Sequence, residues 1–339
     1  MSLTAQQLSQ LSGSCTVLAS IRQEDDEAAW LAVRTRGIGG SDVGAICGVN
    51  QWSSALQIYF RKTGQFEDEP SGASQERMHW GHMLEPVVAD EFERQHDEFT
   101  LREADCTFKS TQYPFLLANV DRFVIDKSTD KIVGILECKT ANDMMNTEWA
   151  AGEVPISYLY QVQHYLFVTG LNRAWISCLV GGNKFYTYDI FFDSQLYTST
   201  ILPVLDNFWN NCVIKLQEPE VQSADGEMFN NLFPAEEVDD EPVDLSDPSF
   251  DILGDEIEAL KAEKKKIETQ IDEKLAKIKQ VLQTHKRGYS LSYEFSWTPR
   301  TRTGVDSTKL QAEYPEVYDN VLKTTHYRQM SIKKVIDDD

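Results

Sequence analysis

The sequence lacks several features that would assign it to a broad class of protein. Its 339 residues contain no run of about 18 consecutive apolar side chains, which argues against a membrane span. The opening MSLTAQQLSQLSGSC has no basic segment followed by an apolar core, so we expect no secretory signal. The six cysteines form no CxxC pair, which argues against a zinc site and a disulfide framework. These absences favour a protein of a reducing cytoplasm.

Positive charge is scarce in the chain, and it is unevenly distributed. The 32 Lys and Arg stand against 54 Asp and Glu, and the net charge of −22 taken alone argues against a nucleic-acid partner. Residues 217–255 hold thirteen acids and no Lys or Arg, whereas residues 285–334 hold nine bases against five acids. Because binding depends on local charge, the total does not exclude DNA.

Apolar residues make up 41% of the chain and aromatic residues 11%, enough for a large core. Helical patterns alternate with strand-like runs over residues 1–216, which predicts an α/β core with a central mixed sheet flanked by helices. The composition then changes. We expect an acidic, loosely ordered linker over residues 217–254 and a small α+β module of a helix and a hairpin over residues 255–339.

The predicted elements follow from hydrophobic periodicity. Helices are expected over residues 21–33, 54–64, 75–96, 157–170, 194–216 and 255–284. Strands are expected over residues 106–110, 116–126, 131–140, 173–182, 184–192, 289–297 and 327–335. Ser41 or Asp42 should cap a short helix, Pro86 should kink or restart its helix, and Asp306 should begin another helix. The helix over 255–284 should pack on its own strands.

One apolar strand, GILECKT at residues 134–140, carries an unusual pair of charges. Glu137 and Lys139 lie two positions apart and therefore share one face of the strand. One interpretation is a surface ion pair worth at most about 1 kcal/mol. The other is a site, because Asp121 lies sixteen residues earlier on the preceding strand. If the strands form a hairpin, the two carboxylates can converge on Mg²⁺ or Mn²⁺, beside a lysine that orients or deprotonates water.

Asp121 followed by Glu137-Cys138-Lys139 resembles the signature of the PD-(D/E)XK nuclease superfamily, with Val120 where that signature often has proline. The segment YLYQVQHYLFVTG resembles the helix that follows the core in lambda-type alkaline exonucleases. The segment HWGHMLEPVVADEFE resembles their metal-site helix. The segment RTRGIGGSDVGAICG resembles the opening motif of the YqaJ-like viral recombinase family. Together the motifs cover about residues 20–215.

The resemblance implies a restriction-endonuclease-like core and a set of metal ligands. Asp121 and Glu137 would bind the divalent metals. The backbone carbonyl of Cys138 and, through water, Glu85 would join them.

The same resemblance implies roles for the residues around the metals. Lys139 would activate the attacking water, Gln161 would orient the nucleophile, and Tyr158 or Tyr165 would support the site. In lambda-type enzymes the glycine-rich region recognises the 5′-terminal phosphate of DNA. That role would fall to Arg34 and Ser41, and Asn119 stands where those enzymes carry a phosphate-binding serine.

The implied activity is a Mg²⁺-dependent 5′→3′ exonuclease of a phage or mobile element, which degrades duplex DNA from its ends and leaves 3′ single strands for annealing-type recombination. The resemblance further implies a ring-shaped homotrimer, a single-strand annealing protein as partner, and the bacterial cytoplasm as location. A related endonuclease or RecB-like nuclease, and a non-catalytic DNA-end-binding scaffold, remain as alternatives.

Overall fold

The computed structural model describes residues 2–21, 26–65, 72–233, 235, 241–324 and 327–333. The chain divides into two compact units, Met1–Leu232 and Phe233–Asp339. Helices of the first unit are α1 (Ala5–Leu11), α2 (Glu27–Arg34), α3 (Gly40–Ile46), α4 (Ala55–Thr63), α5 (Gly72–Gln95), α6 (Asn146–Ala150), α7 (Ile156–Thr169), α8 (Ser194–Leu196), α9 (Leu202–Asn207) and α10 (Asp225–Leu232).

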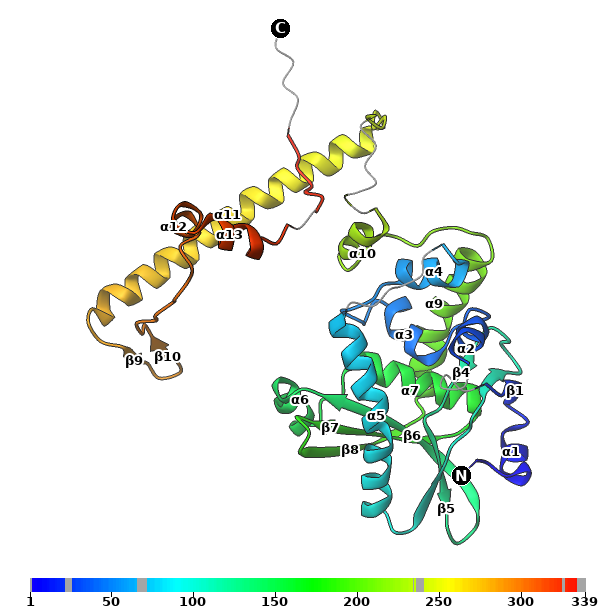
Figure 1. The fold of residues 1–339 in the computed structure, drawn as a ribbon. Coiled ribbons are helices and arrows are strands. Elements are labelled where there is room, and N and C mark those ends of the chain that lie inside the picture. Colours follow the sequence, from blue (N-terminus) through cyan, green and yellow to red (C-terminus); the bar gives the residue numbers. More distant parts are fainter. Residues whose placement is uncertain are drawn as a thin grey trace. The chain divides into compact units, whose positions relative to one another are not determined.

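A five-stranded mixed sheet forms the centre of the first unit, as predicted (Figure 1). Its strand order is β2 (Phe99–Arg102), β5 (Arg122–Asp126), β6 (Lys131–Ala141), β7 (Arg173–Val180) and β8 (Lys184–Phe191). Strands β6 and β7 run parallel, and the other neighbours are antiparallel. The predicted hairpins β5–β6 and β7–β8 are both confirmed.

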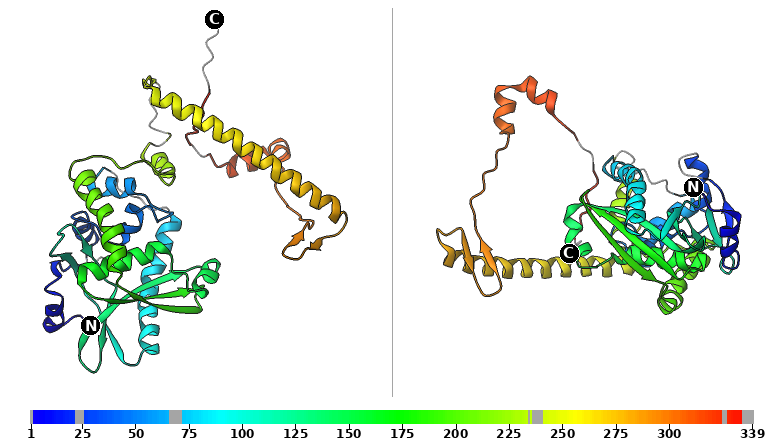
Figure 2. Two further views of the ribbon diagram at one scale, coloured as in Figure 1. Left: turned by 180° about the vertical axis from the view of Figure 1, so that it is seen from behind. Right: turned by 90° about the horizontal axis from the view of Figure 1, so that it is seen from below.

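Alternate side chains of the sheet pack on opposite faces, because successive residues of a strand point to opposite sides. Val124 and Leu136 join Phe92 of α5 in one apolar cluster, whereas Phe123 and Ile135 join the main cluster with α7. Helices α5 and α7 therefore cover different faces of the sheet, which Figure 1 and the view from behind in Figure 2 show.

The run over residues 116–126 differs from the predicted single strand. Leu117–Ala118 form β4, which pairs with β3 (Thr107–Ser110) beside β1 (Cys15–Ala19) in a separate three-stranded sheet. The chain then crosses to the central sheet, where β5 begins at Arg122. The three residues between the sheets, Asn119, Val120 and Asp121, are free of the strand ladders, so the Asp121 carboxylate can turn toward a neighbouring strand.

The helices of the N-terminal half also depart from prediction in detail. Helix α2 begins at Glu27, and residues 22–25 of the predicted helix lie outside the described residues. Neither Ser41 nor Asp42 is the N-cap of α3. Gly39 takes that position, and the Asp42 carboxylate accepts its backbone N–H at 3.0 Å. Helix α4 ends at Gly64 (φ 70°) as predicted, and α5 continues through Pro86 without a restart.

The predicted helix over residues 194–216 is confirmed as a continuous helical segment that includes two π-helical turns, η2 (Tyr197–Ile201) and η3 (Phe208–Val213). Within the acidic segment that follows, Asp225–Leu232 form the helix α10. The Asp225 carboxylate accepts the Ser54 hydroxyl and the Gln222 N–H. The bond to Ser54 attaches α10 to the start of α4. Both donors offset the cost of burying the Asp225 carboxylate.

The second unit contains α11 (Pro248–Leu282), β9 (Arg287–Tyr289), β10 (Glu294–Ser296), α12 (Ser307–Glu313) and α13 (Pro315–Val321). Asp306 caps α12 as predicted. The strand predicted over 289–297 is wrong, because β9 and β10 form a tight hairpin there. The packing predicted for the long helix is found only at its C-terminal end, where Leu282 is buried next to Gly288 of β9 and Lys279 Nζ lies 5.7 Å from the centre of the Trp297 ring. Farther toward its N-terminus, Leu260 and Ile267 are half or more exposed. Residues 327–333 of the predicted last strand are not a strand, and 334–335 lie outside the described residues.

None of the described helices combines the length and the apolar character that crossing a membrane requires.

Candidate active site

The β5–β6 hairpin brings the predicted acidic residues together. Asp121 lies directly before β5, and its Oδ2 accepts the backbone N–H of Cys138, in the middle of β6, at 2.8 Å. This bond holds the Asp121 carboxylate beside the Glu137-Cys138-Lys139 segment. The backbone of Cys138 thus positions Asp121.

Glu137 is buried at the centre of the site, with 2% of its surface exposed. Its Oε1 accepts hydrogen bonds from Lys139 Nζ at 2.5 Å and from Gln161 Nε2 at 2.6 Å. Its Oε2 is buried and has no hydrogen-bond partner in the described part of the chain. The surface ion pair that the strand pattern left open is therefore wrong, since a solvated pair would expose the carboxylate.

Burial and mutual repulsion shift the pKa values of the carboxylates in the site. Burial, with the charge of Asp121 second, raises the pKa of Glu137 to about 8. Burial also raises the pKa of Asp121 and of Glu85. Burial opposes the charge of Lys139, but Glu137 and Asp121 outweigh it, so the pKa of Lys139 lies above its usual value. Burial thus outweighs the favourable charges of Lys139 and Arg122 at Asp121, and that of Arg122 at Glu85.

Helix α7 supplies the residues that flank this centre. Gln161 is buried; besides its bond to Glu137, its Oε1 accepts from Lys139 Nζ at 3.3 Å, and its Nε2 donates to the Tyr165 hydroxyl at 3.2 Å. Tyr158 places its ring 4.8 Å from Lys139 Nζ, within range of a cation–π contact. The two tyrosines that the sequence left as alternatives therefore contact different members of the site: Tyr165 contacts Gln161, and Tyr158 contacts Lys139.

Glu85 reaches the site from α5, but it is bound by a residue that the sequence reasoning missed. Arg122 Nη1 donates to Glu85 Oε1 and to the Asp121 carbonyl, both at 2.6 Å. Arg122 Nη2 lies 3.2 Å from Glu103 Oε1. The guanidinium thus links α5, the end of β2 and the start of β5. An Arg directly after Asp121 in the sequence was the available signal.

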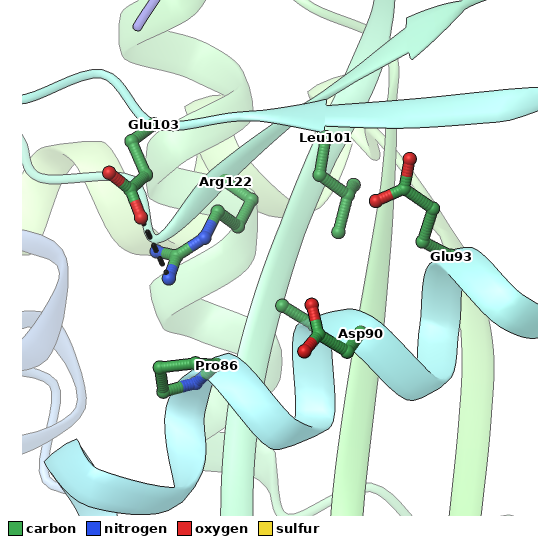
Figure 3. A pocket seen from close by; sticks show the side chains of 7 residues that line it. Pro86, Asp90, Glu93, Leu101, Glu103 and Arg122 are labelled. Carbon is green, nitrogen blue, oxygen red and sulfur yellow. Dashed lines mark ion pairs between the residues drawn. The ribbon is translucent and has the colours of Figure 1, made fainter. Parts of the chain in front are cut away.

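An open pocket of about 190 Å³ lies next to this guanidinium (Figure 3). In Figure 3, Arg122 and Glu103 close one end, while Asp90 and Glu93 rise from α5. The full lining comprises Pro86, Ala89, Asp90, Glu93, Leu101, Glu103 and Arg122.

The residues predicted to bind a 5′-phosphate are partly brought together. Arg34 Nη2 donates to Ser41 Oγ at 2.5 Å, and its guanidinium carbon lies 4.6 Å from the centre of the Trp30 ring. Asn119 is not in this pair, because its amide donates to Thr107 Oγ1 at 2.8 Å. The contacts of Asn119 therefore give no support to a phosphate role.

A buried ion pair that sequence reasoning also missed lies beneath Arg34. Lys62 Nζ lies 2.7 Å from Asp42 Oδ2 and donates to the Arg34 carbonyl at 2.7 Å. Burial opposes ionisation of Asp42, but Lys62 and then Arg34 outweigh it and hold the pKa of Asp42 well below its usual range. The pair fixes the end of α2 against the start of α3.

The donor set fits a divalent cation. A buried carboxylate oxygen without a partner, Oε2 of Glu137, is costly in a folded protein unless a cation or a proton binds it. Asp121 and Glu85 add oxygen ligands of the kind that Mg²⁺ and Mn²⁺ prefer. Over the described ranges, no three His, Cys, Asp or Glu side chains are already grouped to hold a metal. Glu85, bound to Arg122, would reach an ion through water.

Solved structures of similar shape include the alkaline exonuclease LHK-Exo from Laribacter hongkongensis, with a TM-score of 0.45 at 16% identity over 56% of this chain and 93% of that one. A phage-related exonuclease from Haemophilus somnus 129PT has a TM-score of 0.41 at 11% identity, covering 56% of this chain and all of its own, 100%.

Sequence comparison gives the stronger result. The family model for the YqaJ-like viral recombinase domain matches residues 29–172. The uncharacterized protein YqaJ of Bacillus subtilis (strain 168) is 33% identical over 316 residues, which cover 90% of this chain and 94% of that protein. The matched range spans the glycine-rich segment, Asp121, Glu137, Lys139 and Gln161. The chain therefore belongs to the YqaJ-like viral recombinase family.

Proposed function

We propose that this protein is a metal-dependent exonuclease that degrades duplex DNA in the 5′→3′ direction from its ends and leaves 3′ single strands for annealing-type recombination. One observation carries the proposal. The β5–β6 hairpin sets Asp121 beside buried Glu137, whose carboxylate contacts both Lys139 and Gln161. Carboxylates that can hold a metal, with a lysine and a polar amide in contact with them, suit metal-assisted hydrolysis of a phosphodiester.

Asp121 and Glu137 are the proposed metal ligands, joined by the Cys138 carbonyl and, through water, by Glu85. Mg²⁺ is the proposed ion, with Mn²⁺ as a substitute, because the side-chain donors are carboxylate oxygens. Such an ion, when bound, lowers the pKa of a coordinated water and neutralises charge at phosphorus.

The chain's own groups then position the reactants. Lys139 carries its proton, because the neighbouring carboxylates raise its pKa. It therefore orients the attacking water by donating a hydrogen bond to it, and it offsets negative charge at the scissile phosphate. Loss of the water's proton would be favoured by the bound ion, which lowers the pKa of that water. Gln161 bonds both Glu137 and Lys139, so it sets the distance between ligand and lysine.

Recognition of the DNA end is assigned to Arg34 and Ser41. Arg34 stands half-buried and Ser41 exposed, and a guanidinium beside a hydroxyl suits a terminal phosphate. The 54 acidic residues of the whole chain do not oppose this binding where the path of the DNA itself is basic, because binding depends on local charge.

Further parts of the proposal rest on the resemblance to lambda-type exonucleases. These are assembly as a ring-shaped homotrimer, a single-strand annealing protein as partner, and action in the cytoplasm of a bacterial host. Residues 1–216 form the exonuclease core of this proposal, with residues 217–254 as a connecting segment and residues 255–339 as an accessory module.

A related endonuclease or RecB-like nuclease is the second candidate, because the same carboxylates and lysine serve both activities. A non-catalytic DNA-end-binding scaffold is less compatible with the site. A protein that had lost catalysis would have no need to keep Asp121, Glu137 and Lys139 together, since the buried charges are costly.

The test is digestion of linear 5′-phosphorylated duplex DNA with Mg²⁺ by wild type and Lys139→Ala. Lys131→Ala is the matched control, since Lys131 is exposed at the start of the same strand. We expect the wild type and the control to release nucleotides at equal rates and Lys139→Ala to lose about a hundredfold or more. Equal degradation by wild type and Lys139→Ala would overturn the catalytic assignment.

Covalently closed circular DNA separates an exonuclease from an endonuclease. An exonuclease leaves it intact, whereas cleavage at the rate of linear DNA would favour an endonuclease.

A further inference from the structure

Helices α3 and α7 approach each other unusually closely, and two glycines of α3 make this possible. Gly40 and Gly44 lie four residues apart and therefore share one face of the helix. A Cβ atom on Gly40 would lie 2.3 Å from Cε1 of Tyr165, and one on Gly44 would lie 3.0 Å from Cβ of Ser157. Tyr165 and Ser157 both belong to α7. No larger residue fits at position 40 without displacing the Tyr165 ring.

The Tyr165 ring stands between two parts of the proposed site. On one side it packs against Gly40, which directly precedes Ser41, the hydroxyl that Arg34 contacts at 2.5 Å. On the other side the Tyr165 hydroxyl accepts Gln161 Nε2 at 3.2 Å, and the same nitrogen donates to Glu137 at 2.6 Å. One aromatic side chain thus separates the Arg34–Ser41 pair from the buried carboxylate.

The opposite side of α3 is rigidly held. Asp42 accepts the Gly39 N–H and pairs with Lys62, which also donates to the Arg34 carbonyl. Both charged side chains of that pair are only 6% exposed. These bonds tie the end of α2 to the start of α3.

We propose that the contact between Gly40 and the ring of Tyr165 sets the distance from the Arg34–Ser41 pair to the metal centre and so determines specificity for 5′-phosphorylated ends. This inference rests on the proposed function. The scissile phosphodiester lies at a fixed covalent distance from the terminal phosphate, so a displacement of about 1 Å between the two subsites misaligns it and can cost about a hundredfold in rate. Tyr165 is in this sense a positioning residue.

The experiment measures kcat/KM on linear duplexes that differ only in a 5′-phosphate or a 5′-hydroxyl, and the readout is the ratio of the two. Tyr165→Phe keeps the ring against Gly40 and removes only the hydroxyl, whereas Tyr165→Leu removes the ring. Gly40→Ala adds the Cβ that meets the ring. Gly13→Ala is the matched control, because a Cβ there meets nothing within 4 Å.

We expect Tyr165→Phe and Gly13→Ala to keep the wild-type ratio, even where Tyr165→Phe lowers the rate on both ends. We expect Tyr165→Leu and Gly40→Ala to lower the ratio by about tenfold or more. If Gly40→Ala fails to fold in a thermal melt, the two Tyr165 variants decide the question.

Two outcomes would overturn the inference and leave the nuclease assignment intact. In the first, Tyr165→Leu keeps the wild-type ratio of kcat/KM values. In the second, Tyr165→Phe and Tyr165→Leu lower that ratio equally. A wild type without end-dependent degradation, or without preference for the phosphate, would overturn the proposed function or its end recognition, and this inference with it.

Discussion

The buried carboxyl of Glu137 should make the metal-free protein less stable as the pH rises. Burial, and next the charge of Asp121, raises its pKa from 4.5 to about 8. Between these values the folded protein holds a proton that the unfolded chain releases, so stability falls with increasing pH. Each pKa unit corresponds to about 1.4 kcal/mol, and the full interval therefore amounts to about 5 kcal/mol. With 2% of Glu137 exposed, solvent screens little of this effect.

The assay is urea unfolding of wild type and Glu137→Gln in EDTA between about pH 5 and pH 8.5. The difference between their free energies of unfolding reports this carboxyl together with its effect on the pKa of Lys139 and its other charged neighbours, because the remaining titrating groups are common to both proteins. We expect the difference to shift in favour of the variant as the pH rises. Glu98→Gln is the matched control, because Glu98 is exposed and should give a constant difference.

Added Mg²⁺ extends the same measurement to the metal site. At about pH 8 the ion should stabilise the wild type, since it binds the folded state and supplies Glu137 Oε2 with its missing partner. The free energy of unfolding of Glu137→Gln should increase much less on addition of Mg²⁺. A difference that stays flat with pH would refute the argument that burial keeps this carboxyl protonated. An equal gain from Mg²⁺ in both proteins would place the ion elsewhere.

Three further outcomes can be tested. Arg34→Ala should lower kcat/KM on 5′-phosphorylated ends by about tenfold to a hundredfold, as expected for a lost charge-assisted bond. An equal loss on 5′-phosphorylated and 5′-hydroxyl ends would count against the phosphate role. Arg122→Met should destabilise the metal-free protein by about 3 kcal/mol in urea unfolding, because Glu85 loses its partner, and an unchanged midpoint would contradict this. Burial lowers the pKa of His164 from 6.5 to about 4, so the folded state binds fewer protons, and stability should fall by about 3 kcal/mol as the pH drops through that interval. His164→Gln should lose less in the same unfolding series, and equal losses would contradict the assignment.

The β5–β6 hairpin, which carries the proposed catalytic residues, was predictable from local pattern. Alternation places Glu137 and Lys139 on one face, and a polar turn joins their strand to the one that follows Asp121. The order of helices and strands likewise follows from hydrophobic period, because one buried face per element is a local property of the chain.

Contacts between distant segments were not predictable in this way. Arg122 joins Glu85 and Glu103 across three elements, and Lys62 reaches Asp42 from a different helix. Arg122, Glu103 and Lys62 read in the sequence as ordinary surface charges, and neither the contact of Arg122 with Glu85 nor that of Lys62 with Asp42 is visible there. Their burial depends on which elements pack together, and the local pattern does not contain that information.

The residues that could do chemistry, and the strands and helix that carry them, were thus readable in the linear order of the chain. Three-dimensional packing determined the rest: the burial of Glu137 with an unpartnered oxygen, the placement of Tyr165 between Gly40 and Gln161, and the exposure of the apolar residues of α11. Local periodicity specifies which side of an element is apolar, whereas the neighbour that covers that side, or fails to, depends on contacts among residues far apart in the chain.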